Sequence, residues 1–312
     1  MHQNLDPKLW TGRIDSETDR DAFKWHQNIT DAPNPEGLSI LGFECDEGVK
    51  RNQGRIGAKA APNLLKKAMA NLPSHAPLHQ KIFDAGTVTC VASDLEAAQT
   101  TMAEHTTKLL ANSGLVLNLG GGHEIAWASY LGLANHLEQS TQNPKIGIIN
   151  FDAHFDLRDS DQASSGTPFA QIAAHCQTKS WNFNYLVMGI SETNNSKALF
   201  NIADKLNVNY RLARHVSMQH LADCKKQLSD FIQKVDVIYL TIDLDAFPAA
   251  VAPGVSAPAT RGIPLEIVEP LIKQIVGSTK LKLVDIAEYN PNFDIDNRTA
   301  NLAARLAFLV SK

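Results

Sequence analysis

The chain has 312 residues, 44% of them hydrophobic, and a formal net charge of −4 at pH 7. This composition supplies a full globular core and argues against wholesale disorder. The acidic balance argues against a nucleic-acid-binding protein, which would need an excess of basic residues, but it is compatible with a small anionic substrate held by one or two cations.

Neither a targeting signal nor a membrane span is evident in the sequence. Residues 1–10 are polar and lack an apolar signal core, and no apolar run reaches the ~18 residues that span a bilayer. The cysteines are scattered and form no CxxC pair, which is typical of reduced thiols: Cys45, Cys90, Cys176 and Cys224. We therefore expect a cytoplasmic protein that binds neither membranes nor nucleic acid.

Short apolar runs alternate with amphipathic stretches along the chain. The apolar runs predict strands at 38–43, 82–86, 114–119, 145–151, 184–190, 235–242 and 281–287, with a further short strand near 208–210. The amphipathic stretches predict helices at 61–72, 93–112, 123–137, 168–175, 197–205, 218–234, 264–276 and 296–310.

The strand runs are nearly continuous in Val, Ile and Leu, as expected for strands that are buried on both faces. Their alternation with helices predicts an α/β fold, a three-layer α-β-α sandwich with a mostly parallel sheet of roughly eight strands. No linker or repeat divides the chain, so we expect one catalytic domain over 36–312, preceded by an N-terminal extension over 1–35.

Polar clusters follow four of the predicted strands, at the edge where open parallel sheets form their sites. In chain order these residues are His123 and Glu124 after the triple glycine 120–122, then Asp152, His154 and Asp156, then Asp243 and Asp245, and finally Glu288. Each cluster alone is also explained by helix capping or turn chemistry. The triple glycine does not fit a dinucleotide loop, because Ile125 occupies the sixth position of the pattern G-x-G-x-x-G.

The Asp-x-His-x-Asp pattern favours a metal site over these ordinary interpretations. Asp152, His154 and Asp156 would point the same way if the strand continued, and three unpaired polar groups on one buried face would be costly. Asp243 and Asp245 repel each other, and a divalent cation reverses that repulsion.

The set of two histidines and four aspartates suits two ions that share carboxylates. Oxygen-rich ligation with imidazole, and no cysteine nearby, favours manganese. A water bridging two such ions loses a proton near neutral pH and becomes a nucleophile. The residues themselves therefore predict a hydrolase.

These motifs resemble the arginase, agmatinase and formiminoglutamase family of ureohydrolases. Three segments carry the resemblance in family order and spacing: Gly-Gly-Gly-His at 120–123, Asp-Ala-His-Phe-Asp at 152–156 and Asp-Leu-Asp at 243–245. The match runs from about residue 52 to the C-terminus. Trimers or hexamers are common in the family, so the resemblance also implies a homo-oligomer.

The resemblance implies a ligand set for two Mn²⁺ ions per chain. One ion would be held by His123, Asp152, Asp156 and Asp243, and the other by Asp152, His154, Asp243 and Asp245. Asp152 and Asp243 would bridge the ions. Glu288, in the segment Asp-Ile-Ala-Glu, matches the family carboxylate that binds the amidine or guanidine group of the substrate.

Departures from the arginase pattern make the chain similar to formiminoglutamases. Phe169 stands where arginases have a proton-shuttling histidine, and Ser165 stands where agmatinases have the histidine of His-Gly-Thr. The segments Asn-Gln-Gly-Arg-Ile-Gly-Ala at 52–58, Phe-Asp-Leu-Arg at 155–158 and Ala-Pro-Gly-Val-Ser-Ala-Pro at 252–258 look like those of formiminoglutamases. The resemblance thus implies hydrolysis of N-formimidoyl-L-glutamate to L-glutamate and formamide, a reaction of histidine degradation.

The charges of this substrate suggest which residues bind it. Arg158, two residues past Asp156, is expected to grip a substrate carboxylate through two parallel hydrogen bonds. Arg55 is a second candidate, equally suited to a structural ion pair, and Asn52 and Thr167 complete the predicted substrate-binding residues.

Two residues are predicted to be catalytic. Glu288 is expected to pair with the amidinium, and Asp156 to carry the proton that the departing amine needs.

Two alternatives stay open on the sequence. One is a guanidine hydrolase of the agmatinase or guanidinobutyrase type, since a loose pocket accepts related substrates. The other is a non-catalytic relative that serves as an oligomeric scaffold, although such a protein need not keep six ligand-type residues together.

Overall fold

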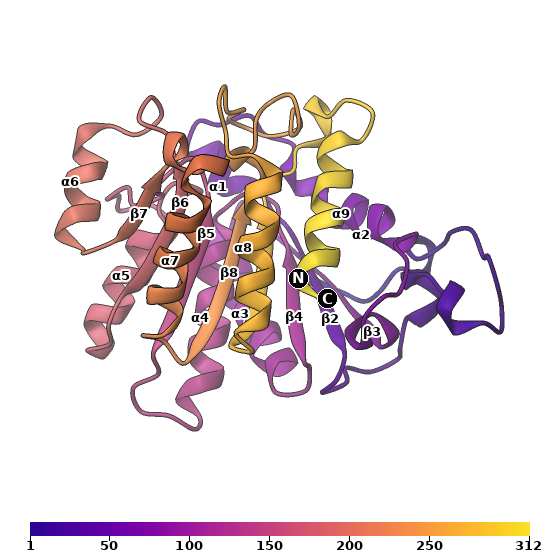
Figure 1. Ribbon diagram of the computed structural model, residues 1–312. Helices are drawn as coiled ribbons and strands as arrows, with labels where there is room; N and C mark the ends of the chain where they lie inside the picture. Colours follow the sequence, from indigo (N-terminus) through magenta and orange to yellow (C-terminus); the bar gives the residue numbers. More distant parts are fainter.

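Nine strands form one sheet in the computed structural model, which describes residues 1–312 (Figure 1). The strands are β1 (His2–Gln3), β2 (Leu38–Glu44), β3 (Ile82–Thr89), β4 (Leu115–Leu119), β5 (Ile146–Phe151), β6 (Asn184–Ile190), β7 (Asn209–Leu212), β8 (Val237–Asp243) and β9 (Leu281–Ala287). Their order across the sheet is β1-β3-β2-β4-β9-β8-β5-β6-β7. All neighbours pair in parallel except β1 and β3, which are antiparallel.

Helices cover both faces of this sheet, as a three-layer sandwich requires (Figure 1). They are α1 (Glu47–Arg51), α2 (Ala61–Ala70), α3 (Leu95–Leu110), α4 (Ile125–Glu138), α5 (Pro168–Lys179), α6 (Lys197–Lys205), α7 (Leu221–Ile232), α8 (Leu265–Gly277) and α9 (Arg298–Val310). Side chains of α2, α7, α8 and α9 form one buried apolar cluster, and those of α3, α4 and α5 contribute to a second. None of the helices is long and apolar enough to cross a membrane.

The central strands have the continuous apolar sequences that burial on both faces demands. Every residue of β4 and β5 is buried, and the eight predicted strands are all present, with ends that shift by only a few residues. The predicted α/β sandwich is therefore confirmed. The ninth strand, β1, has two residues and is too short to produce an apolar run.

Segment 1–35 packs closely against the rest of the protein. Its strand β1 pairs with β3, and Trp25 is fully buried. The indole of Trp10 donates a 2.7 Å hydrogen bond to Asp84, whose other carboxylate oxygen lies 2.6 Å from the ammonium of Lys66. A buried ion pair with an added hydrogen bond therefore holds this segment against α2 and β3.

A buried histidine joins the same segment to the C-terminal helix. His79 is fully buried and its ring lies 5.0 Å from that of Trp25. Its Nδ1 accepts a hydrogen bond from the backbone N–H of His75, and its Nε2 lies 2.9 Å from the hydroxyl of Ser311. Burial, followed by the charges of His75 and Lys312, lowers the pKa of His79 to about 4.

This neutral histidine should make the fold sensitive to acid. Between pH 6.5 and about 4 the unfolded chain binds a proton at His79 that the folded chain does not, so acidification lowers the free energy of unfolding. We expect this one group to contribute about 2 kcal/mol of that loss. Urea unfolding of the wild type and of His79→Gln across this window should show a flatter pH dependence in the variant; parallel losses would contradict the assignment.

Candidate metal centre and adjoining cavity

Four neighbouring strands deliver the candidate ligands to one edge of the sheet. The strands β4, β9, β8 and β5 are adjacent and parallel, so their carboxyl ends meet at the same edge. His123 follows β4 and Glu288 follows β9, while Asp243 is the last residue of β8. Asp152 comes directly after β5. The topology therefore gathers residues that are as much as 165 positions apart in the sequence.

The glycines before His123 allow their backbone to lie close against Cys45 and Glu124. An added Cβ at Gly121 would lie 1.7 Å from the carbonyl oxygen of Cys45, and one at Gly122 would lie 2.1 Å from Oε2 of Glu124. Any side chain would displace this loop, which turns from β4 into α4 and carries the histidine.

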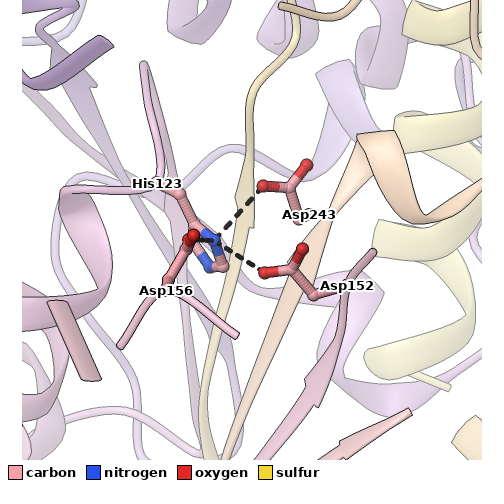
Figure 2. Close-up of side chains that lie close together, drawn as sticks. All are labelled: His123, Asp152, Asp156 and Asp243. Atoms are coloured by element: carbon pink, nitrogen blue, oxygen red, sulfur yellow. Dashed lines mark hydrogen bonds and ion pairs between the residues drawn. The ribbon is translucent and has the colours of Figure 1, made fainter. Parts of the chain in front are cut away.

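The first group of ligands surrounds His123 (Figure 2). Its Nδ1 lies 2.9 Å from Oδ2 of Asp156, 3.1 Å from Oδ2 of Asp152 and 3.2 Å from Oδ2 of Asp243. Figure 2 shows the three carboxylates converging on this ring nitrogen. One atom from each of these residues lies within 4.8 Å of the others, which is the spacing of a shared cation.

A second group adjoins the first through a common carboxylate. Nδ1 of His154 lies 3.1 Å from Oδ2 of Asp245 and 3.6 Å from Oδ1 of Asp152. Asp152 belongs to both groups, whereas Asp243 has a ligand atom in the first group only. The structure thus brings all six expected ligands together, and the bridging role of Asp243 stays a prediction.

The charges of this cluster fit divalent cations. Burial and the charges of Asp245 and Asp152 raise the pKa of Asp243 well above its usual value, and burial and Asp152 raise the pKa of Asp156 to about 6. Oδ1 of Asp245 is buried without a hydrogen-bond partner. Four crowded carboxylates, with only two imidazoles against them, match the oxygen-rich ligation of Mn²⁺.

Polar residues inside the strands orient two of the ligands. The hydroxyl of Thr241 in β8 lies 2.8 Å from Nε2 of His123, which leaves Nδ1 facing the carboxylates. The amide of Asn150 in β5 donates a 3.0 Å hydrogen bond to Oδ2 of Asp152. Such outer contacts fix the direction of metal ligands. Neither residue was predicted, although a polar residue within a buried apolar run is a recognisable signal.

A cavity of about 310 Å³ opens over this cluster. Besides every candidate ligand except Asp152, it is lined by Asn52, Gln53, Gly54, Arg55, Arg158, Ser165, Asn194, Asn195, Leu199, Ser256, Ala257 and Glu288. Leu199 and Ala257 are its only hydrophobic lining residues, so the cavity suits a small polar molecule.

Glu288 lies on the cavity wall in a constrained position. Its φ of 68° is in the left-handed region, as is the φ of 49° at Asp156. Oε1 accepts a 2.9 Å hydrogen bond from the backbone N–H of His123, while Oε2 is buried without a partner. Burial and the nearby Glu124 raise the pKa of Glu288 to about 8. A cationic ligand would therefore find an incompletely satisfied carboxylate here.

The two candidate arginines differ in whether their guanidinium groups already have hydrogen-bond partners. Arg158 lies along Gly166, where an added Cβ would be 2.8 Å from its Cδ, and its guanidinium has no hydrogen-bond or ion-pair partner. Arg55 donates from Nε to the carbonyl of Ser256 at 2.9 Å and from Nη2 to that of Val255 at 2.6 Å. The guanidinium of Arg158 is thus available to bind a ligand. Two nitrogen atoms of the Arg55 guanidinium are instead bonded to the loop that contains Val255 and Ser256.

The remaining predicted substrate-binding residues lie in different surroundings. Asn52 lines the cavity and its amide donates to Ser165 at 3.2 Å. Thr167 lies outside the cavity lining: it is buried, accepts the N–H of Ser164, and lies 3.1 Å from Oε1 of Gln171 at the start of α5. Its side-chain contacts stabilise the turn before α5 and leave no polar atom directed at the cavity.

Phe169 is fully buried beside the metal cluster. Its ring stacks on Tyr185 at 4.3 Å and meets His123 edge-on at 5.5 Å. It therefore provides no group at this position that titrates or reaches the cavity.

Comparisons with known proteins place this geometry in context. A model of the arginase family matches residues 36–311 of the chain. A formimidoylglutamase from Chromobacterium violaceum is 47% identical over 310 residues, which cover 99% of this chain and 98% of that protein. The match therefore extends over nearly the whole length of both proteins.

Solved structures share the fold at low sequence identity. The formimidoylglutamase of Bacillus subtilis has a TM-score of 0.80 and 22% identity, covering 95% of this chain and 93% of that one. A formiminoglutamase of Trypanosoma cruzi crystallised with Mn²⁺ has a TM-score of 0.75 and 20% identity, covering 92% of this chain and 97% of that one.

Proposed function

The chain belongs to the arginase family, and we propose that it hydrolyses N-formimidoyl-L-glutamate to L-glutamate and formamide. The main observation behind the proposal is that the buried histidine–aspartate cluster adjoins the same cavity as Arg158, whose guanidinium has no hydrogen-bond or ion-pair partner. The 47% identity to a formimidoylglutamase over nearly the whole chain supports the same substrate.

Two manganese ions would be held by the six clustered side chains. The ligands would be His123, Asp152, His154, Asp156, Asp243 and Asp245. Bound there, such ions supply Lewis acidity and lower the pKa of water. The presence of Mn²⁺ in the Trypanosoma cruzi formiminoglutamase structure supports this choice of metal.

The cavity's own charges would orient the substrate. The unpartnered Oε2 of Glu288 would accept a hydrogen bond from the amidinium, whose positive charge restores the ionised carboxylate. Arg158, which lines the same cavity, would bind a substrate carboxylate. Holding both ends fixes the amidine carbon over the metal cluster and reduces the entropy lost in the reaction.

Asp156 would move the proton that the leaving amine requires. It lines the cavity beside the other candidate ligands, where its carboxylate could accept a proton from the attacking water and pass it to the amine. The neighbouring Phe169 has no titratable group to replace it. The amine leaves as the α-amino group of glutamate when the C–N bond of the tetrahedral adduct breaks.

The products distinguish this reaction from guanidine hydrolysis. Manganese-loaded protein should release formamide from formimidoylglutamate, and should release little urea from arginine, agmatine or guanidinobutyrate. Agmatine has no carboxylate for Arg158 to bind. Faster urea release from a guanidine would overturn the proposed substrate, and a protein that takes up no manganese would favour the non-catalytic scaffold.

Arg158→Ala should raise KM for formimidoylglutamate far more than it lowers kcat. A charge-assisted contact of up to about 3 kcal/mol corresponds to about a 100-fold rise in KM. Steady-state kinetics on the manganese-loaded protein measures it. Arg261→Ala is the matched control, because Arg261 is exposed and lines a different cavity; equal effects of the two substitutions would argue against a substrate contact at Arg158.

A further inference from the structure

One asparagine side chain holds the backbone on both sides of His154. Asn195 lies in the loop after β6 and is 6% exposed. Its Nδ2 donates to the carbonyl of Ala153 at 2.9 Å, and its Oδ1 accepts from the N–H of Phe155 at 3.1 Å. A single amide group thus fixes the two peptide groups that flank this candidate ligand.

The ring of His154 has little else to orient it. Its Nδ1 faces Asp245, its Nε2 makes no hydrogen bond, and its side chain is 23% exposed. His123 differs, because its Nε2 is held by Thr241 and its side chain is 1% exposed. Metal-binding histidines usually depend on a partner at the second ring nitrogen, so the direction of His154 depends on its backbone.

The loop that carries Asn195 is itself firmly seated on the metal loop. The N–H of Ser191 donates to the carbonyl of Ala153 at 2.9 Å, and Nδ2 of Asn195 also donates to the carbonyl of Ser191 at 2.8 Å. Gly189 has a φ of 124°, and an added Cβ there would lie 2.6 Å from the carbonyl of Asp152. The end of β6 is therefore a close-fitting support for the segment after β5.

We propose that Asn195 is a positioning residue that aims His154 and so controls occupancy of the second ion site without affecting the first. The proposal rests on the two-ion assignment of the proposed function. Asn195 hydrogen-bonds to none of the ligand side chains, and the two peptide groups that it holds after β5 are those on either side of His154; its third hydrogen bond goes to Ser191 in its own loop. The first site has four ligands and the separate support of Thr241, whereas the second group contains three.

Metal content measured without substrate tests this assignment. At a low free Mn²⁺ concentration that still fills both sites of the wild type, the wild type should hold about two ions per chain and Asn195→Ala about one. The dissociation constant of the lost ion should rise by about 10–100-fold, which is the usual effect of removing an outer contact, while that of the other ion stays unchanged. Saturating Mn²⁺ should restore the second ion to the variant.

The control removes an equivalent amide from the far end of the same strand. Asn184 donates from Nδ2 to the carbonyl of Ile146 at 3.1 Å, at the amino ends of β6 and β5. Asn184→Ala should keep both manganese constants. Metal-free Asn195→Ala and metal-free Asn184→Ala should both melt below the wild type, because each loses hydrogen bonds of an amide side chain, whereas only Asn195→Ala should lose manganese.

Retention of both ions with wild-type constants in Asn195→Ala would overturn the proposal. So would an equal weakening of both ions, since that result indicates general structural damage. If the alanine variant does not fold, Asn195→Asp serves instead, because it keeps the acceptor for Phe155 and replaces the donor to Ala153 and Ser191 with a carboxylate oxygen that repels both carbonyls. A wild type that binds no manganese would instead overturn the proposed function and this inference with it.

Discussion

Asp152→Asn is expected to abolish manganese binding at both sites and to lower kcat/KM by at least about 1000-fold. Asp152 is the one residue that belongs to both ligand groups. Both of its oxygens are already oriented: Oδ1 accepts from the N–H of His154 at 2.7 Å and Oδ2 from Asn150 at 3.0 Å. The substitution keeps the shape and removes the shared charge, and metal chemistry of this kind supplies several kcal/mol.

A second prediction concerns the thermal stability of Asp152→Asn. Manganese that binds the folded chain raises the melting temperature of the wild type by mass action, and this rise should be absent in Asp152→Asn. Asp159→Asn, at an exposed position in the same loop, is the control. Full manganese content in Asp152→Asn would show that Asp152 is not a manganese ligand.

Glu288→Gln is expected to lower kcat/KM by about 100-fold while both manganese ions are retained. Glu288 belongs to neither ligand group, and glutamine keeps a carbonyl oxygen for the N–H of His123. What disappears is the charge that faces the amidinium, and a charge-assisted hydrogen bond contributes up to about 3 kcal/mol.

Metal content and kinetics together separate these two variants. Glu288→Gln should lose rate with full metal, whereas Asp152→Asn should lose both. Glu266→Gln, at an exposed position on α8, should behave as the wild type in both assays. A Glu288→Gln enzyme with the wild-type kcat/KM would show that the amidinium is bound elsewhere.

The sequence was sufficient for the sheet because buried parallel strands need long apolar runs. β5 and β8 could be placed within two residues, and the polar residues at their ends marked the site edge. Strand β1 could not be predicted, since two residues carry no periodicity and its pairing with β3 depends on the folded chain.

The limits of prediction at the site are also physical. The loop contacts of Arg55 involve residues 200 and 201 positions away, so no local pattern reveals that its guanidinium is occupied. Asn195 reaches the metal loop only because β6 lies beside β5. Thr241 and Asn150 did leave a signal, since each is a polar residue within an apolar strand.

The left-handed backbone at Asp156 and Glu288 has a consequence for how this protein can change. A residue with a side chain held in that region costs of order 1 kcal/mol or more, a cost that glycine avoids. Replacing either residue by glycine would therefore relieve strain and also remove a carboxyl group from the cavity. The metal-free fold therefore bears a backbone cost at both positions, and the carboxyl groups that these residues place in the cavity are what it obtains in return.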